Sequence, residues 1–257
     1  MITALNIILL SILGLLLGSF YNVVAIRLLK RESIAFPPSH CVHCDRKLAF
    51  ADLVPLFSYL LLKGRCRYCS EKVSARYPLG ELLTALSFVL MYVQLGFNPE
   101  LAVGLFFVSI LIIITQTDLQ AMIIPNSIVL TGVVGAVGLR IWIHPLPLTN
   151  YLIAAFVGSG ILLLVGLVSS WFLKKEAMGG GDIKLYVFIG FILGIKLTAL
   201  SIFFASLLGL IFGLILILTK RFEKQKEIPF GPYIALGSLF VYLWGEQLIE
   251  WYLALLL

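Results

Sequence analysis

Long apolar stretches, separated by short polar segments or by segments with proline and glycine, run through this sequence from end to end. A helix needs about 20 mainly apolar residues to cross a bilayer, so these stretches predict membrane-spanning helices. We predict eight of them, at about residues 2–22, 79–96, 100–117, 124–143, 150–173, 183–197, 199–219 and 232–254. The chain is 61% hydrophobic, far above the roughly 45–50% of soluble domains, which makes lipid the expected solvent for most of it.

The first apolar stretch is expected to be a retained membrane helix. A secretory signal peptide normally has Lys or Arg before its apolar stretch and a cleavage site with small residues after it. Neither feature is evident around this stretch. The predicted fold class is therefore an all-α polytopic membrane protein.

The positions of the basic residues predict an orientation. They concentrate between the first and second predicted helices, around the loop after the fifth, and in residues 220–226 after the seventh. With eight helices, all of them except Arg140 and Lys196 fall on one face, and the positive-inside rule places that face in the cytoplasm and both chain ends outside it. The net charge of +6 is thereby explained by topology, and nucleic-acid binding is not expected.

One sizeable polar segment, residues 27–78, is predicted to be a small cytoplasmic domain between the first two helices. Residues 1–26 then form the first membrane helix and residues 79–257 the remaining membrane domain. A domain of about 50 residues rarely builds a sufficient core, so it usually needs a disulfide or a metal.

All four cysteines lie in this segment, as two CxxC pairs with 21 residues between them. Two such pairs can supply four thiolates to one tetrahedral zinc ion. Two disulfides or four free thiols are the alternatives, and a cytoplasmic location disfavours disulfides. Four sulfur ligands leave no open position for water or for the flanking His40 and His43, so the zinc site should be structural. The predicted ligands are Cys41, Cys44, Cys66 and Cys69.

Two aspartates, Asp118 and Asp182, are predicted at the cytoplasmic ends of the third and sixth helices. Acids within membrane spans cost about 2.5–3.5 kcal/mol at a helix centre and are functional candidates by default. Each could instead be a solvated helix-end residue, with Asp182 as an N-cap. However, the topology places both at the same depth on the same side, and Gly179–Gly181 would let a substrate strand approach closely.

Two neighbouring carboxyl groups share a proton, so one can deprotonate water while the other polarises a peptide carbonyl. This chemistry hydrolyses an amide without a metal or a nucleophilic side chain. A Ser/His/Asp arrangement is poorly supplied, because His40, His43 and His144 lie beside cysteines or in the opposite loop.

Several motifs resemble those of the type IV prepilin peptidases over nearly the whole chain. They are Gly18-Ser-Phe-Tyr-Asn22-Val-Val-Ala-Ile-Arg27, the two CxxC pairs, Pro55-Leu-Phe-Ser58 to Gly64-Arg-Cys66, Arg76-Tyr77-Pro78 with Glu81, Asp118 with Pro125, Gly179-Gly-Gly181-Asp182-Ile-Lys184, and Ile228-Pro-Phe-Gly231-Pro232. The resemblance implies a GxGD-type aspartic endopeptidase of the bacterial inner membrane, with Asp118 and Asp182 as its catalytic pair.

The resemblance also implies substrates and a second activity. The substrates would be prepilins or pseudopilins of type IV pili, type II secretion or competence systems, cut after a glycine that precedes a hydrophobic helix. Many family members then methylate the new amino terminus with S-adenosylmethionine. Gly64 is the residue of this chain to which the resemblance assigns a part in methyl transfer. Lys184, Gly179 and Gly181 would support catalysis, although Lys184 could equally be a positive-inside anchor.

Two other readings remain. A transporter or channel with a zinc-stabilised cytoplasmic cap would use the two aspartates to bind an ion or relay protons. Acids near the bilayer midplane and inverted repeats would favour such a protein, and the sequence shows neither. A passive zinc-containing scaffold would leave the aspartates unexplained.

Overall fold

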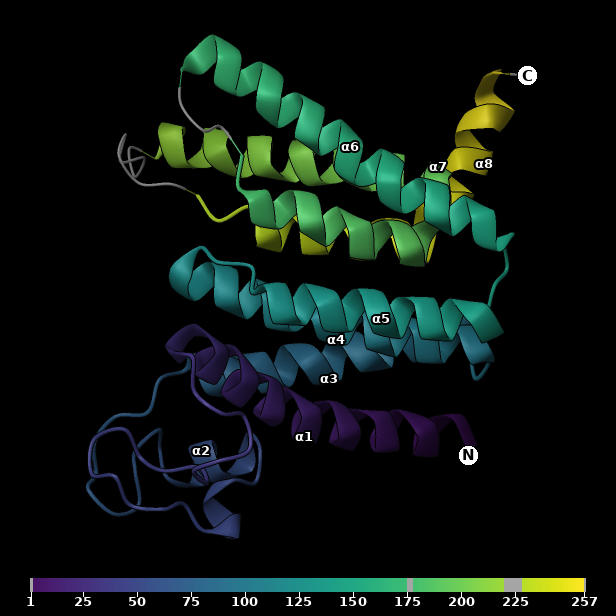
Figure 1. Ribbon diagram of the computed structural model, residues 1–257. Coiled ribbons are helices and arrows are strands. Elements are labelled where there is room, and N and C mark those ends of the chain that lie inside the picture. Colours follow the sequence, from purple (N-terminus) through teal and green to yellow (C-terminus); the bar gives the residue numbers. More distant parts are fainter. Residues whose placement is uncertain (1, 175–177, 220–227, 257) are drawn as a thin grey trace. The chain divides into compact units, whose positions relative to one another are not determined.

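The computed structural model describes residues 2–174, 178–219 and 228–256, and it is almost entirely helical (Figure 1). These residues form no strand; their isolated β-bridges join His40 to Lys47 and Arg65 to Lys72. The all-α prediction is therefore confirmed. The chain divides into two compact units, Met1–Phe97 and Asn98–Leu257. The domain boundaries expected after residues 26 and 78 stay a prediction.

Five helices among the described residues are long and apolar enough to cross a bilayer, which supports a multi-pass membrane protein. They are Thr3–Lys30, Arg76–Leu95, Pro99–Ala121, Leu148–Phe172 and Gly180–Leu218. Helix α5 (Asn126–Trp142) is apolar but shorter, and α8 (Gly231–Leu256) is not in this set. The predicted number of eight spans therefore stays a prediction.

In the first unit, α1 (Ile2–Lys30) packs along α3 (Arg76–Leu95). Small residues allow the close approach, because a Cβ at Gly14 would lie 2.5 Å from the Cα of Ala85. Helix α1 extends beyond the predicted end at residue 22. Arg27 and Lys30, which were expected in the following loop, lie in its last turn, where positive charge is favourable.

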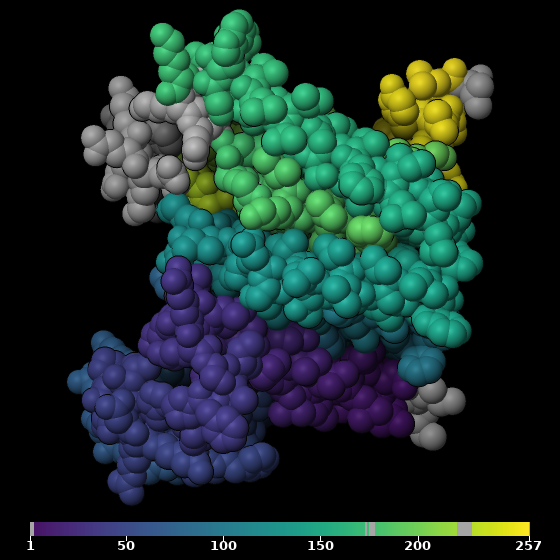
Figure 2. Space-filling view, viewed as in Figure 1, coloured from purple at the N-terminus to yellow at the C-terminus, as the bar shows by residue number. Residues whose placement is uncertain are grey.

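The segment between these helices, residues 31–75, is called the cysteine lobe below. It contains a 3-10 helix, η1 (Phe50–Asp52), and a short helix, α2 (Phe57–Leu61). Figure 2 shows it as a rounded body at one end of the purple α1. The buried Arg27 guanidinium donates to the backbone carbonyls of Ser33, Ile34 and Pro37, which fixes the chain where it leaves α1.

The second unit contains five helices: α4 (Pro99–Ala121), α5 (Asn126–Trp142), α6 (Leu148–Leu173), α7 (Gly180–Leu218) and α8 (Gly231–Leu256). Helix α7 packs against α5, α6 and α8, while α4 packs against α5 and α8. Asn98 caps the start of α4 through a bond from the Leu101 amide, and Pro99 suits the first helical position.

Helix α7 is broken at Gly194, which has φ 75° and ψ 173°. Figure 1 shows the chain reversing there, so the two halves of α7 lie side by side. Asn150 Oδ1 accepts a 3.0 Å bond from the Ile195 amide, which caps the second half. A side chain at Gly194 would need a disfavoured φ and would meet Asn150 Oδ1 at 2.6 Å. The break lies a few residues before the boundary predicted between 197 and 199.

Arg140, which was expected towards the face opposite most of the basic residues, is buried and only 3% exposed. Its guanidinium pairs with Glu100 at 2.8 Å and donates to the Ile192 carbonyl, while the Tyr242 hydroxyl donates to Glu100. A buried cation requires such partners, and this one joins α4, α5, α7 and α8.

The basic residues predicted to form the cytoplasmic loop after the seventh helix lie outside the described residues. They are Lys220, Arg221, Lys224 and Lys226, and the same holds for Lys175 in the preceding loop.

Candidate active site and metal centre

Asp118 occupies the last turn of α4. The helix ends immediately afterwards because Met122 adopts a left-handed conformation, with its amide donating to the Asp118 carbonyl at 2.8 Å. The Asp118 residue is 6% exposed. The end of α4 therefore holds this carboxyl group inside the second unit.

Asp182 occupies the first turn of α7 and is 9% exposed. Helix α7 begins at Gly180, and its N-cap is Gly179, without a side-chain cap. The alternative in which Asp182 serves as an N-cap is therefore wrong. A carboxylate in the first turn is still favoured by the helix dipole.

The structure brings the two aspartates together, although their helices are separated in sequence by α5 and α6. Their carboxyl groups interact electrostatically. Gly231, the first residue of α8, donates its amide to Asp118 Oδ2 at 2.7 Å. The end of α4 and the beginnings of α7 and α8 thus converge on one site.

At two positions of this site, neighbouring side chains come so close to the backbone that only glycine fits. A Cβ at Gly231 would lie 2.7 Å from Asp118 Oδ2, and a Cβ at Gly181 would lie 2.9 Å from the Cβ of Ile124. At Gly179 a Cβ would lie 3.6 Å from Asp182 Oδ2, which is ordinary contact. The sequence analysis assigned no role to Gly231. Its place between Pro229 and Pro232 is the feature of the sequence that could have indicated a functional role.

Lys184, expected to support the aspartates, is exposed and donates to Asn126 Oδ1 at 3.1 Å. This bond joins the start of α7 to the start of α5. Whether Lys184 supports the carboxyl pair or serves as a positive-inside anchor stays a prediction.

Two buried carboxyl groups that interact electrostatically cannot easily both ionise, so they are suited to holding one proton between them. The arrangement can supply a general base for water and a general acid for a carbonyl oxygen. The Gly231 amide fixes one oxygen of Asp118, and so it orients this carboxyl group for that chemistry.

The four cysteine sulfurs lie within 4.8 Å of one another, and the Cys41 and Cys69 sulfurs are 3.8 Å apart. Tetrahedral zinc with Zn–S bonds of about 2.3 Å requires sulfurs about 3.8 Å apart. The donor set and its spacing therefore fit zinc, which Cys41, Cys44, Cys66 and Cys69 would hold.

The two CxxC pairs fold alike, which explains how they present their sulfurs. The amide of Asp45 donates to Cys41 O, and that of Ser70 donates to Cys66 O, with both donors at positive φ. Backbone amides of His43 and Cys44 lower the pKa of the Cys41 thiol to about 6. This shift favours the thiolate form that binds metal.

Asp52 joins η1 to the second cysteine pair. It accepts from Arg67 Nε at 2.6 Å and from the Tyr68 hydroxyl at 2.9 Å. Burial alone would raise the pKa of Asp52, but these two bonds outweigh it and hold that pKa below its usual value. The Arg46 guanidinium lies over the Tyr68 ring, so the two cysteine pairs are also joined directly.

Gly64, the position linked to methyl transfer, follows α2 and has φ 68°. A Cβ here would lie 2.9 Å from the ring of Tyr59. Gly64 therefore leaves the space that the Tyr59 side chain occupies in the first unit.

Comparison with known proteins identifies the family of this chain. Residues 12–95 match the family model described as the bacterial peptidase A24 N-terminal domain, and residues 105–214 match the type IV leader peptidase family. No solved structure matches the chain.

Several relatives share most of the chain. A prepilin leader peptidase/N-methyltransferase of Bacillus subtilis is 38% identical over 96% of this chain and 98% of its own length. Proteins of the same name from Aeromonas salmonicida and Xanthomonas campestris are 34% and 32% identical, over 95% and 94% of this chain and 92% of their own lengths. The chain therefore belongs to the type IV leader peptidase family and is a peptidase of that family.

Proposed function

We propose that the protein is a membrane aspartic endopeptidase that removes the short basic leader of type IV prepilins or pseudopilins, cutting after a glycine. The observation that carries this proposal is the meeting of two buried carboxyl groups, Asp118 and Asp182, at the ends of α4 and α7. The names of the relatives support the substrate class. The transporter reading has no support from the family or from the site.

Asp118 and Asp182 would act as one unit. The ionised member removes a proton from water, which attacks the carbonyl carbon of the peptide bond, while the protonated member donates to the carbonyl oxygen. Collapse of the tetrahedral intermediate breaks the C–N bond: one of its hydroxyl groups returns a proton to the pair, and the departing amine takes a proton from the pair. The pair is thereby returned to its initial state, with one proton held between its two members.

A second step would follow at the new amino terminus. We propose that it receives a methyl group from S-adenosylmethionine, as the N-methyltransferase part of the relatives' names suggests. The zinc ion has a structural role in this account, because four cysteines complete its coordination shell.

The proposed location is the bacterial cytoplasmic membrane, with the cysteine lobe and the two aspartates on the cytoplasmic side. The basic residues motivate this orientation. Single cysteines on a zinc-site-free background should react with an impermeant maleimide in intact spheroplasts at Asn98 or Pro147. A cysteine at Lys63 should react only after permeabilisation. Labelling in the reverse order would refute the orientation.

The cleavage rule can be tested with purified protein and a synthetic prepilin peptide that spans the leader and the first hydrophobic turns. We expect a cut after the junction glycine, because a residue without a side chain lets the backbone approach the buried carboxyl pair. Replacing that glycine with valine should slow cleavage by about 100-fold or more, which corresponds to about 3 kcal/mol in the barrier.

The matched control is a peptide in which a glycine or alanine elsewhere in the leader is changed to valine, and it should be cut at the normal rate. Equal rates for the junction and control peptides, or a cut at another bond, would contradict the proposed specificity.

A further inference from the structure

Helix α2 presents an exposed apolar face on the cysteine lobe. Phe57, Leu60 and Leu61 have the i, i+3, i+4 spacing that places side chains on one side of a helix, and they are 58%, 61% and 82% exposed. Phe50 of η1, which packs against α2, is 87% exposed. Large apolar side chains that gather on a surface mark a contact with another molecule or with a membrane.

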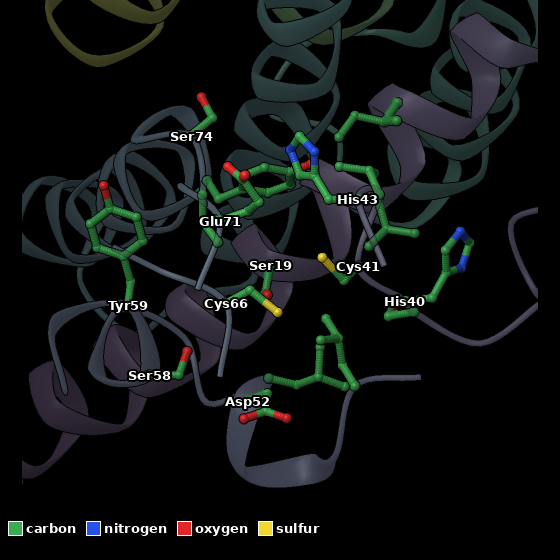
Figure 3. A pocket seen from close by; sticks show the side chains of 18 of the residues that line it. Ser19, His40, Cys41, His43, Asp52, Ser58, Tyr59, Cys66, Glu71 and Ser74 are labelled. Atoms are coloured by element: carbon green, nitrogen blue, oxygen red, sulfur yellow. The ribbon is translucent and has the colours of Figure 1, made fainter. Parts of the chain in front are cut away.

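The other side of α2 faces the membrane helices of the same unit. Ser58 and Tyr59 line a cavity together with Ser19 of α1 (Figure 3). The Leu56 amide, directly before α2, donates a 2.7 Å bond to Glu81 of α3, and the Ser19 hydroxyl interacts with the same carboxyl group. The beginning of α2 is therefore held beside α1 and α3, at the level of Ser19 and Glu81, and not beyond the ends of these helices.

The length of α3 converts this level into a depth in the bilayer. Both α1 and α3 are long and apolar enough to cross a membrane. Helix α3 has 20 residues, so its length of about 30 Å equals the thickness of the hydrocarbon core. Glu81 lies five residues after Arg76, the first residue of α3, which is about 7 Å along the helix. The start of α2 thus lies about 7 Å below the surface of the hydrocarbon.

Helix α1 gives the same result. A Cβ at Gly18 would lie 2.7 Å from the Cα of Glu81, so the two helices meet at this level. With 29 residues, α1 is about 13 Å longer than the hydrocarbon core is thick. Ser19 lies 11 residues before Lys30, or about 16 Å from the end of the helix. Even if the whole excess protruded at that end, Ser19 would still lie within the hydrocarbon.

The residues around α2 fit a lipid interface. At the same depth, Leu79, Leu82 and Leu83 of α3 are also exposed, as expected for a surface that faces acyl chains. Directly after α2 come the exposed cations Lys63 and Arg65. Helices that lie in a membrane interface bury an apolar face about 5–10 Å deep and keep Lys and Arg near the headgroups. The face of α2 therefore has the depth, the composition and the flanking charge of such a helix.

We propose that α2 anchors the cysteine lobe in the membrane interface, with Phe57, Leu60 and Leu61 among the acyl chains and Lys63 and Arg65 at anionic phosphate groups. The partner of this surface is thus an anionic lipid bilayer. The lobe would be attached to the membrane at three places, α1, α2 and α3. The inference requires only that α1 and α3 cross the bilayer, so it does not depend on the proposed cleavage reaction.

Tryptophan fluorescence of the full-length protein in vesicles of phosphatidylglycerol and phosphatidylcholine tests the proposal. The background variant has phenylalanine at the four native tryptophans, Trp142, Trp171, Trp244 and Trp251. A single new tryptophan, Leu61→Trp, should lose about half or more of its fluorescence to lipids with brominated acyl chains, which quench only the groups they contact. Glu32→Trp, an exposed position beyond the end of α1, is the matched control, and brominated lipids should quench it by less than about a tenth.

The part played by the headgroups is tested on the same Leu61→Trp protein. Quenching by brominated lipids should fall by about a third or more in vesicles of phosphatidylcholine alone, because the attraction of the cations to anionic lipid is lost. Adding Lys63→Gln and Arg65→Gln should cause the same loss in vesicles that contain phosphatidylglycerol. Equal quenching in neutral and anionic vesicles would overturn the assignment of anionic lipid as the partner.

Acrylamide, a quencher dissolved in water, distinguishes the other outcomes. Quenching of Leu61→Trp by acrylamide as strong as that of Glu32→Trp would place the face in water. Protection of Leu61→Trp from acrylamide without quenching by brominated lipids would mean that a second copy of the chain or another protein covers the face. Either result would overturn the proposal.

Zinc content reports whether each variant is folded. If the background without native tryptophans loses zinc, hydroxyl-radical footprinting of the wild-type protein in the same vesicles replaces the fluorescence measurement. Phe50 and Phe57 should then be oxidised about threefold or more slowly than Phe36, which is 75% exposed and lies next to the carbonyls that bind Arg27. Equal oxidation of the three phenylalanines would overturn the proposal.

Discussion

Asparagine in place of either Asp118 or Asp182 should lower the rate of prepilin cleavage by about 10⁴-fold, a loss typical of a residue in a catalytic unit. The amide is close in size to the carboxyl group, but it can neither accept the proton of water as a base nor share a proton with its partner. Because the two residues act together, the double variant should be scarcely slower than either single variant. Initial rates with the synthetic prepilin peptide measure all three losses.

Two controls separate lost chemistry from lost folding. The variants should keep the zinc content and the thermal unfolding temperature of the wild-type protein. Glu246→Gln, an exposed acid change in α8, should leave the cleavage rate unchanged. Multiplicative losses in the double variant would show that the two carboxyl groups act independently, contrary to the shared-proton mechanism.

Replacing Cys41 and Cys66 together with serine should remove zinc and unfold the cysteine lobe. Each change removes a thiolate from a different CxxC pair, so neither pair can hold the ion alone. Zinc binding contributes about 10–16 kcal/mol in small zinc domains, far more than a lobe of this size can replace. Metal analysis should fall from one zinc per chain to none, and limited proteolysis should cut within residues 31–75.

The matched control for the cysteine variant is His43→Ser, which changes a neighbour of the metal site outside the predicted ligand set. It should keep one zinc per chain and resist proteolysis like the wild-type protein. Zinc that persists in the double cysteine variant, or that is absent from the wild-type protein, would refute the assignment of the ligands.

Local patterns predicted much of this molecule. Apolar length is sufficient to locate membrane helices, and CxxC spacing is sufficient to propose a zinc site, because both depend on residues close in sequence. The two aspartates could be paired from sequence because helix count and charge bias place both at one membrane face.

The features that sequence reasoning missed depend on contacts distant in sequence. The sequence did not predict the burial of Arg140, because its partner Glu100 is 40 residues away. The Gly231 amide reaches Asp118 across 113 residues. The sequence predicted separate helices at 183–197 and 199–219, but it did not identify Gly194 as the residue of the break, because a glycine within an apolar stretch is equally compatible with a continuous membrane helix.

Mass spectrometry of an intact prepilin in proteoliposomes tests the central claim most directly, with the wild-type protein and the double Asp118→Asn, Asp182→Asn variant run side by side. The wild-type protein should yield two fragments whose masses place the cut after the junction glycine, and the variant should leave the prepilin whole. Fragments from the same bond at a comparable rate in the variant would contradict the account, because the bond would then be cut without the two carboxyl groups.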